Sequence, residues 1–438
     1  MKHILVVLIL AGAISLAQGQ DISYFKKNIK ELSSEKYGGR GYDKDNDGKA
    51  AQYIADEFAN AGAKVTFQEI TFPINDFNGK VDFFVDGKKL RPGYDYSLST
   101  YSSSAKGTFK THYIDSAAFD MNKTVEFLKD KGGDLVIILN MSRDARMLMM
   151  KLSSQKIKLR GMIIRNGREK AATLVQVSGM GDEMSEVSPV MMNKTYTNMI
   201  SLQFPLFVVD KKAFSVNVKE VAFDVETHLT KNEKSSNVIA TIQGNIYPDS
   251  IFVFTAHYDH LGMLGTQVFY PGANDNASGT SMLLSLADYY GKPENKPACT
   301  LVFLATTGEE MGLLGSKEFV NNPPFNLKNI KYLLNFDMVA DQADTLTTYS
   351  DRFAIRGYDL VKAINEKEGL FKTVTYAKYQ QNSDHYPFLL RGVPAICFIL
   401  EKGKNFNRLH TPDDNADHIS YLSFSKIFRL ATEFVKQY

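Results

Sequence analysis

The stretch SIFVFTAHYDHLG, residues 250–262, runs from an apolar segment directly into two histidines and an aspartate. A similar pattern recurs after Ser236, where short apolar segments such as TLVFLATT, IKYLLNFD and PAICFIL alternate with segments of helical periodicity. Strands that are apolar throughout and separated by helices form mostly parallel sheets covered on both faces. We therefore predict an α/β fold whose mostly parallel, twisted sheet is flanked by helices.

The N-terminal half divides into two parts. Residues 20–64 carry apolar positions at helical spacing and are predicted to pack on the sheet of the C-terminal part, residues 231–438. Between about 65 and 230 the pattern changes to alternating strands, such as KVTFQEITF and GKVDFFVDG, without a catalytic-looking cluster of His, Asp and Glu. We therefore predict a β-rich domain, residues 65–230, inserted into the domain that carries the chemistry.

The acidic stretch DKDNDG, residues 43–48, begins like a calcium-binding loop, with Asp43, Asp45 and Asp47 at alternate positions. The twelfth position of such a loop needs a bidentate glutamate, and Ile54 stands there instead. A turn that caps the following helix is the better interpretation of this stretch.

The composition narrows the class of protein. The chain has 438 residues, of which 44% are hydrophobic and 23% charged, as is typical of a globular protein with a large core. A formal net charge of +2, with no basic tract, argues against nucleic acid as a partner. Its two cysteines, Cys299 and Cys397, lie in apolar segments and are predicted to be buried thiols.

Residues 1–19 have the features of a secretory signal peptide. Lys2 precedes an apolar segment from Ile4 to Leu16, and the small residues Ala17 and Gly19 offer cleavage points. The apolar segment is short for a membrane span, so we predict no stable span after the signal is removed. The mature protein is expected to be secreted or periplasmic, and its oligomeric state is left open.

Residues that can bind metals follow several of the predicted strands. In parallel sheets, ligands bind beyond the carboxyl ends of the strands, so side chains at these ends are expected to converge. Five such residues follow strands, namely His257, Asp259, Glu309, Glu310 and Asp337. Asp275 directly precedes a predicted helix, and His410 follows the last predicted strand. Their concentration at one edge of one sheet indicates a shared site.

Imidazoles and carboxylates without cysteine suit Zn²⁺ or a neighbouring divalent metal. Two imidazoles and three carboxylates are enough for two ions that share one bridging carboxylate and each keep a position open for water. Asp259 can accept the second ring N–H of His257, which lies two residues before it. Glu309 is the natural general base for metal-bound water. His260 is expected to lie beside the ligands or to be exposed.

The motifs HYDHLG, PGANDNASGT, TTGEEMGLLGS, NFDMV and HTPDDNADHI, in this order, resemble the zinc aminopeptidases of peptidase family M28. The resemblance covers the chain from about Ser236 to the C-terminus and implies the phosphorylase/hydrolase-like fold of those enzymes. It further implies that one zinc is held by His257, Asp275 and Asp337, and the other by Asp275, Glu310 and His410. Glu309 would shuttle the proton, and Asp259 would be the partner of His257. The β-rich insert resembles a protease-associated domain.

The function implied by this resemblance is that of an exported di-zinc aminopeptidase, which removes N-terminal residues from peptide substrates. Two zinc ions bridged by Asp275 would activate water, and Glu309 would take its proton. The segment NSDHYPF offers His385 as a donor to the negative charge that develops on the attacked carbonyl oxygen.

Other functions on related scaffolds stay open. A carboxypeptidase or dipeptidase would keep the metal ligands, although a carboxypeptidase needs a basic cluster for the substrate carboxylate, and Arg391 and Arg408 form none that is convincing. The segments DHYPFLLRGVP and HTPDDN also resemble glutaminyl cyclases, which use one zinc, whereas NDNASG and Asp337 favour two. A non-catalytic binding protein of this family would be expected to have lost a ligand, and here all five positions and Glu309 are present.

Overall fold

The computed structural model describes residues 21–115, 119–140, 142–166, 202–378, 381–401, 403 and 406–438. The predicted signal peptide, residues 1–19, lies outside this part of the chain. Among the described residues, no helix combines the length and the apolar character needed to cross a membrane.

In the described part of the chain, the first of two large sheets contains eight strands in the order β1-β10-β14-β11-β15-β18-β16-β17. Their bounds are β1 (Lys64–Asp76), β10 (His228–Ile242), β11 (Tyr247–His257), β14 (Cys299–Thr306), β15 (Ile330–Phe336), β16 (Thr345–Ser350), β17 (Thr373–Lys378) and β18 (Ala395–Ile399). Strands β14, β11, β15 and β18 are parallel to one another. The antiparallel pairings lie toward the sides, between β1 and β10, β10 and β14, and β16 and β18. The predicted α/β fold is thus confirmed, with its parallel strands at the centre.

Helices cover both faces of this sheet. Successive side chains of a strand point to opposite faces, and in β14 the residues from Thr300 to Thr306 are all buried, so neither face is open to solvent there. The helices of this part are α2 (Ile22–Leu32), α3 (Asn46–Asn60), α6 (Gly279–Gly291), α7 (Leu314–Asn321), α8 (Ile355–Glu368), α9 (His385–Leu390) and α10 (Phe424–Gln437). Helix α6 contacts β11, β14 and β15 and packs against α2, α3 and α10, while α7 and α9 pack against each other.

Local sequence explains two of these helices. Asp21 caps α2, because its carboxylate accepts the backbone N–H groups of Ser23 at 2.8 Å and Tyr24 at 3.0 Å. In α10 the apolar residues recur at spacings of three and four and form one buried face, made of Phe424, Ile427, Phe428, Ala431 and Phe434. The predicted helical character of residues 20–64 is confirmed by α2 and α3.

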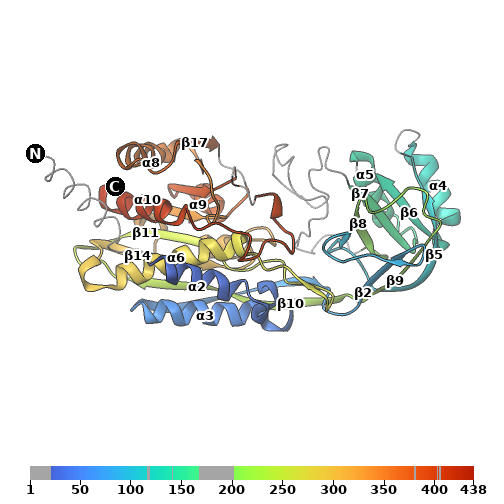
Figure 1. Cartoon of the computed structure of the whole chain (residues 1–438), viewed down its shortest axis with the longest axis horizontal. Coiled ribbons are helices and arrows are strands. Elements are labelled where there is room, and N and C mark those ends of the chain that lie inside the picture. Colours follow the sequence, from blue (N-terminus) through green and yellow to red (C-terminus); the bar gives the residue numbers. More distant parts are fainter. Residues whose placement is uncertain are drawn as a thin grey trace, which may run out of the picture.

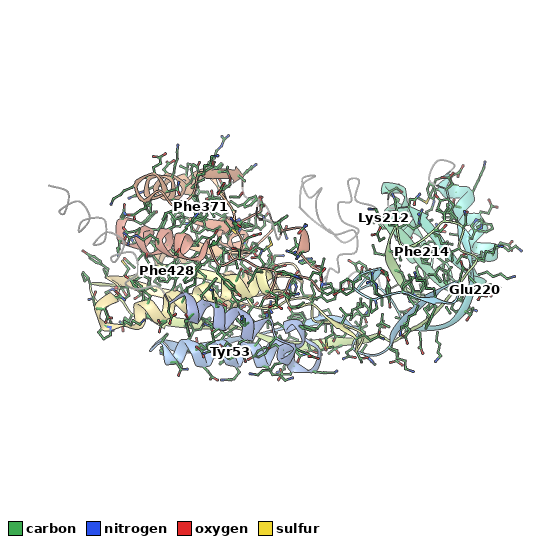
Figure 2. All side chains as sticks on the ribbon, in the orientation of Figure 1. Tyr53, Lys212, Phe214, Glu220, Phe371 and Phe428 are labelled. Carbon is green, nitrogen blue, oxygen red and sulfur yellow. The ribbon has the colours of Figure 1, made fainter. Side chains whose placement is uncertain are left out.

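The second sheet also has eight strands among the described residues, in the order β3-β2-β9-β5-β6-β7-β8-β4. Its elements are β2 (Val81–Val85), β3 (Lys88–Lys89), β4 (Tyr96–Leu98), β5 (Ala105–Tyr113), β6 (Leu135–Asn140), β7 (Gly161–Asn166), β8 (Leu206–Asp210), β9 (Glu220–Val225) and the helices α4 (Met121–Lys131) and α5 (Arg143–Ser154). Figure 1 shows this sheet beside the first along the length of the molecule. Phe214 lies in the core of this second unit, and Phe428 lies in that of the first (Figure 2).

The chain does not pass from one sheet to the other at residues 65 and 230, the predicted limits of the insert. Residues 64–76 of β1 pair with residues 228–241 of β10 in the first sheet, and the second sheet is built only from residues between Val81 and Val225. The limits were misplaced because β1 and the start of β10 alternate like the strands of the second sheet, and periodicity does not reveal the partner of a strand. The division into domains itself stays a prediction.

The segment that follows β11 joins the two units. It contains the short hairpin of β12 (Met263–Leu264) and β13 (Val268–Phe269). Leu261, Leu264 and Tyr270 pack into the same buried cluster as Phe77 and Val81, which belongs to the second sheet. The residues directly after His260 are therefore held by the core of the second unit.

Candidate metal centre

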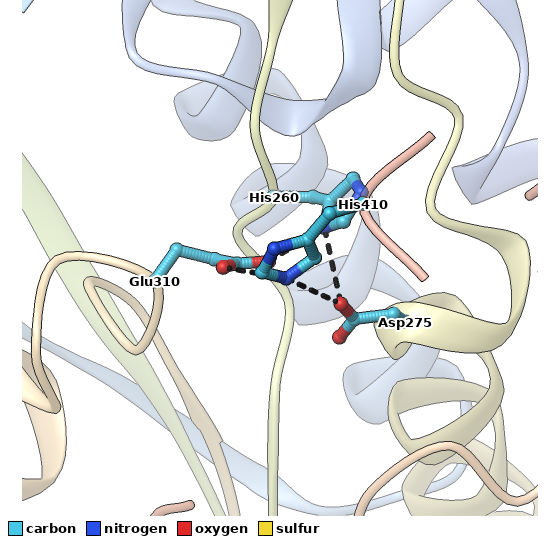
Figure 3. Close-up of side chains that lie close together, drawn as sticks. All are labelled: His260, Asp275, Glu310 and His410. Carbon is cyan, nitrogen blue, oxygen red and sulfur yellow. Dashed lines mark hydrogen bonds and ion pairs between the residues drawn. The ribbon is translucent and has the colours of Figure 1, made fainter. Parts of the chain in front are cut away.

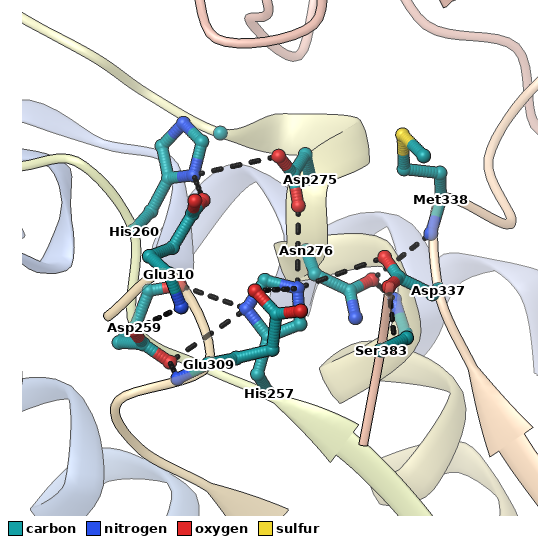
Figure 4. A network of polar contacts seen from close by, with 12 residues as sticks. His257, Asp259, His260, Asp275, Asn276, Glu309, Glu310, Asp337, Met338 and Ser383 are labelled. Carbon is teal, nitrogen blue, oxygen red and sulfur yellow. Dashed lines mark hydrogen bonds and ion pairs between the residues drawn. The ribbon is translucent and has the colours of Figure 1, made fainter. Parts of the chain in front are cut away.

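The predicted ligands meet at the carboxyl ends of the central parallel strands. His257 is the last residue of β11, Glu309 and Glu310 follow β14 after Gly308, and Asp337 follows β15. These three strands are adjacent and parallel, so their carboxyl ends lie at one edge of the sheet. Figure 4 shows the side chains from these ends turned toward one another.

Among the described residues, two groups of side chains each have ligand atoms that all lie within 4.8 Å of one another. The first ligand group consists of His257, Glu309 and Asp337, and the second ligand group of His260, Asp275, Glu310 and His410. The structure thus brings together all five predicted metal ligands and the predicted base.

Asp275 belongs to the second ligand group and also faces the first. Its Oδ1 is 3.3 Å from Nε2 of His257, and its Oδ2 is 3.0 Å from Nε2 of His410. Asp414 holds the backbone of this segment, because its carboxylate accepts the N–H groups of Asn274 at 2.9 Å and Asp275 at 3.0 Å. The two oxygens of one carboxylate are therefore presented to different groups.

The other ligand atoms approach the same histidines. Nε2 of His257 is 3.6 Å from Oδ1 of Asp337 and 4.0 Å from Oε2 of Glu309. Nε2 of His410 is 3.1 Å from Oε2 of Glu310. The second ligand group is drawn in Figure 3, where Asp275 and Glu310 face the His410 ring. Each group therefore combines imidazole nitrogen with carboxylate oxygen.

His260 is more central than the sequence indicates. It is fully buried, and its Nδ1 lies 2.7 Å from Oε1 of Glu310 and 3.7 Å from Oδ2 of Asp275. Of its two expected places, exposure is excluded, and a place beside the ligands is confirmed. A signal for a place of His260 in the site was available in the sequence, because it directly follows Asp259 in the segment after β11.

Asp259 has more partners than the single one expected from the sequence. The backbone carbonyl of Asp259 lies 3.1 Å from Nδ1 of His257, whereas its carboxylate Oδ1 is 3.7 Å from the same nitrogen. The carboxylate accepts the backbone N–H groups of Glu309 at 3.2 Å and Glu310 at 3.3 Å. It also accepts the hydroxyl of Tyr42 at 2.8 Å. Asp259 therefore positions both glutamates as well as the histidine.

The electrostatics of the site follow from many buried carboxylates. Burial, reinforced by neighbouring carboxylates and opposed by His257, raises the pKa of Glu309 well above its usual range. Burial alone would also raise the pKa of Glu310, but His410 and hydrogen bonds from histidines lower it to about 2. The pKa values of the adjacent glutamates Glu309 and Glu310 are thus shifted in opposite directions. Such opposite shifts are typical of acid and base pairs in catalytic sites.

The donor set fits a divalent cation. Oδ1 of Asp337 and Nε2 of His260 are buried and have no hydrogen-bond partner among the residues that the structure describes. Buried polar atoms without partners are unfavourable, and clustered carboxylates need a compensating charge. Imidazole and carboxylate without thiolate are donors that suit zinc and its neighbours in the divalent series.

Arg40 is a site residue that the sequence did not reveal. Its fully buried guanidinium donates to the carbonyl oxygens of Tyr258 at 2.6 Å, Pro271 at 2.6 Å and Gly272 at 2.8 Å. These carbonyls belong to the segments that carry His257 and Asp275, so one side chain ties both segments together. A signal was available, since the arginine lies within the glycine-rich stretch YGGRG. At Gly39, φ is +69° and a Cβ would lie 2.4 Å from the Tyr270 carbonyl oxygen, so only glycine fits.

The segment 383–385 packs against the same strand ends. Ser383 donates to Oδ2 of Asp337 at 2.6 Å, and Thr306, the last residue of β14, donates to the buried carboxylate of Asp384. Burial raises the pKa of Asp384 to about 6. His385 is fully buried, and neither ring nitrogen has a hydrogen-bond partner among the described residues. Its predicted role as a donor to the substrate stays a prediction.

His385 should make the protein sensitive to acid. Burial lowers its pKa to about 3, whereas an unfolded histidine titrates near about 6.5. Below about pH 6.5 the unfolded chain therefore binds a proton that the folded chain does not, and stability falls by up to about 1.4 kcal/mol per pH unit until about pH 3. Urea unfolding between pH 8 and pH 5 should show a weaker acid dependence in His385→Leu. The exposed His418 is a matched control, and equal acid dependence in His385→Leu and His418→Leu would contradict the prediction.

Comparisons with known proteins agree with this geometry. Residues 237–435 match the model of peptidase family M28. Over 220 residues the chain is 37% identical to a probable zinc metalloprotease of Pyricularia oryzae, covering 42% of this chain and 43% of that protein. It is 34% identical over 200 residues to aminopeptidase YwaD of Bacillus subtilis, covering 43% of this chain and 41% of that protein. The matched part thus spans about half or less of the length of these curated relatives.

Solved structures share the fold over almost the whole chain. A zinc aminopeptidase from Bacillus subtilis superposes with a TM-score of 0.68 at 21% identity and covers 95% of both chains. A peptidase M28 precursor from Shewanella amazonensis superposes with a TM-score of 0.69 at 18% identity, covering 97% of this chain and 95% of that one. At such identities the likeness establishes the fold. Residues 237–435, which contain all the residues of both ligand groups, therefore match the model of peptidase family M28.

Proposed function

We propose that the chain is a di-zinc aminopeptidase, which hydrolyses the first peptide bond of peptide substrates. The observation that carries this proposal is the place of Asp275, whose two oxygens face His257 and His410 in different ligand groups. One zinc would be held by His257, Asp275 and Asp337, and the other by Asp275, Glu310 and His410. Names of similar proteins, a zinc metalloprotease and an aminopeptidase, support the reaction class.

When bound, the ions lower the pKa of a water molecule and polarise the carbonyl of the substrate. Glu309 supplies the base, because its carboxylate lies in the first ligand group and is not needed as a ligand. Its raised pKa lets it accept the proton of the water and return it to the leaving amine. Asp259 fixes the backbone N–H groups of Glu309 and Glu310, so that base and ligand keep their places. His385 would donate its one N–H to the developing oxyanion.

We also propose that the second sheet belongs to a protease-associated insert beside the mouth of the site. Contacts between the insert and the segment after His410 support this. The hydroxyl of Tyr94 forms a hydrogen bond with Asp413, and a Cβ at Gly93 would lie 2.7 Å from Pro412. We propose further that residues 1–19 direct export, so that the mature enzyme is secreted or periplasmic.

Metal analysis and an amine-release assay test the proposed function together. We expect about two zinc ions per purified mature chain and release of the reporter amine from leucine, alanine or lysine anilides. Exhaustive chelation should abolish release, and added zinc should restore it. Full activity after chelation would contradict the metal assignment. Two ions without release from any anilide would contradict the aminopeptidase assignment and favour a carboxypeptidase or dipeptidase.

A further inference from the structure

A row of three hydroxyl groups connects two buried carboxylates, Asp259 at the metal centre and Asp47 near the surface. Tyr42 donates to Oδ2 of Asp259 at 2.8 Å and forms a side-chain hydrogen bond with Thr307. The hydroxyls of Thr307 and Ser235 are 2.6 Å apart, and Ser235 donates to Oδ2 of Asp47 at 2.6 Å. We call Tyr42, Thr307 and Ser235 the hydroxyl chain.

The hydroxyl chain is assembled from segments far apart in the sequence. Tyr42 precedes α3, Ser235 lies in β10, and Thr307 directly follows β14, two residues before Glu309. Asp47 lies in the first turn of α3 and is 2% exposed. Asp47 and Ser235, at this end of the hydroxyl chain, line a surface pocket of about 150 Å³ together with Gln52 and other residues. The hydroxyl chain therefore runs from solvent to the centre, and the proposed mechanism does not use it.

The number of hydrogens available for hydrogen bonds between Asp47 and Asp259 depends on whether one of the two carboxylates is protonated. Four links join the two carboxylates through three hydroxyls, and each hydroxyl has one hydrogen to donate. When both carboxylates are ionised, one of the four links lacks a hydrogen. A proton on Asp47 supplies the fourth, and every hydroxyl then donates toward Asp259. The neighbouring Tyr258 adds no hydrogen to the row, because its hydroxyl donates to the Ser236 carbonyl at 2.8 Å and can only accept from Ser235, at a longer 3.5 Å, and from Thr307.

Of the two carboxylates at the ends of the row, Asp47 is the one that carries the proton more readily. Asp259 already accepts two backbone N–H groups and the Tyr42 hydroxyl. Burial raises the pKa of Asp47 to about 7, and the hydrogen bonds from Ser235 and the Gly48 backbone only partly oppose this effect. The charged and titratable groups that face Asp47 are Asp45 and Glu233, which raise its pKa further, with Lys234 in the pocket and Tyr42 and Tyr258 on the inner side.

We propose that Asp47 is a positioning residue for the metal centre, acting through the hydroxyl chain on Asp259. The inference rests on the proposed peptidase function. Because Asp259 holds the backbone of Glu309 and Glu310, a complete row of hydrogen bonds holds the general base and a ligand more firmly than an interrupted one. Protonation of a carboxylate at the surface pocket thereby reaches the catalytic glutamate without touching substrate or metal.

The pH profile of hydrolysis tests this role. In Asp47→Asn the amide donates to Ser235 at every pH and mimics the protonated acid. We expect kcat/KM of this variant to match the wild type below about pH 7 and to exceed it severalfold above, with the change centred near the pKa of Asp47. Asp56→Asn is the matched control, because Asp56 is exposed on the same helix and should keep the wild-type profile. A profile of Asp47→Asn that parallels the wild type would overturn the proposal.

Tyr42→Phe decides whether the effect travels through the hydroxyl chain. Phenylalanine keeps the ring and removes the hydroxyl, so the row is cut next to Asp259. In this background the Asp47→Asn substitution should no longer change the profile. If it changes the profile as much as in the wild type, the charge of Asp47 acts through space and the hydroxyl chain has no role.

A spectroscopic titration separates this inference from the proposed function. In protein labelled with ¹³C at the tyrosine Cζ, the Tyr42 resonance is assigned by its loss in Tyr42→Phe. We expect it to shift as the pH passes the pKa of Asp47 in the wild type and to stay constant in Asp47→Asn. A resonance that titrates equally in both proteins would refute the coupling. Absence of peptide hydrolysis would refute the proposed function and leave this titration to decide the coupling.

Discussion

Replacement of Glu309 by glutamine is expected to lower kcat/KM for an anilide substrate by about 10²–10⁴-fold, the usual contribution of a general base. Glutamine keeps the shape of the side chain but cannot take the proton of the attacking water. Glu309 is not among the proposed metal ligands, so the zinc content should stay at the wild-type value. Activity assays on protein of measured metal content would show whether the loss is chemical.

A matched control for this substitution is Glu318→Gln. Glu318 lies on α7, accepts the side-chain amide of Asn322 at 2.7 Å and belongs to neither ligand group, so its replacement should leave both activity and metal content unchanged. Hydrolysis by Glu309→Gln at the wild-type rate would show that another group takes the proton. Loss of zinc from this variant would instead identify Glu309 as a ligand, as its place in the first ligand group permits.

Asp275→Asn should have the second large effect, because it changes the carboxylate whose two oxygens face a histidine of each ligand group. The amide is a weaker donor to zinc and cannot present two anionic oxygens. We expect both ions to bind more weakly, hydrolysis to fall to background, and the stabilisation of the fold by added zinc to shrink. A bound ligand stabilises a protein by an amount that grows with the logarithm of the ratio of its free concentration to its Kd, so thermal unfolding with and without zinc measures the weaker binding.

The control for this variant lies on the helix that follows. Asp288 is a partly exposed residue of α6, 2.9 Å from Lys292, and contributes to neither ligand group. Asp288→Asn should therefore keep its zinc and its activity. If Asp275→Asn lost only one ion and kept the other at wild-type affinity, the shared carboxylate would be disproved, and Asp275 would be a ligand of a single ion.

Most of the candidate site could be predicted because its residues follow strands. An apolar strand that ends in a ligand-type residue can be recognised locally, and the parallel arrangement then places such ends together. This reasoning located His257, Asp337 and the pair Glu309 and Glu310. It left two places open for His260, because a histidine in a loop looks the same in sequence whether it points to the solvent or into the site.

The strand pairing at the side of the first sheet was not predictable in the same way. The residues of β1 and β10 alternate as those of the second sheet do, and their pairing spans 64–76 and 228–241. Local periodicity reports that a strand has a buried and an exposed face, but it carries no information about which strand lies beside it.

The sequence by itself determined the chemical types at the centre, the strand ends that carry them and the family whose pattern they follow. Only the tertiary structure decided which residues support them. Arg40 reaches the Tyr258 carbonyl over 218 positions of the chain, and Tyr42 reaches Asp259 over 217. The physical reason is that ligand residues are marked by their own strands, whereas a supporting side chain acquires its role only when packing brings a distant segment within hydrogen-bonding distance.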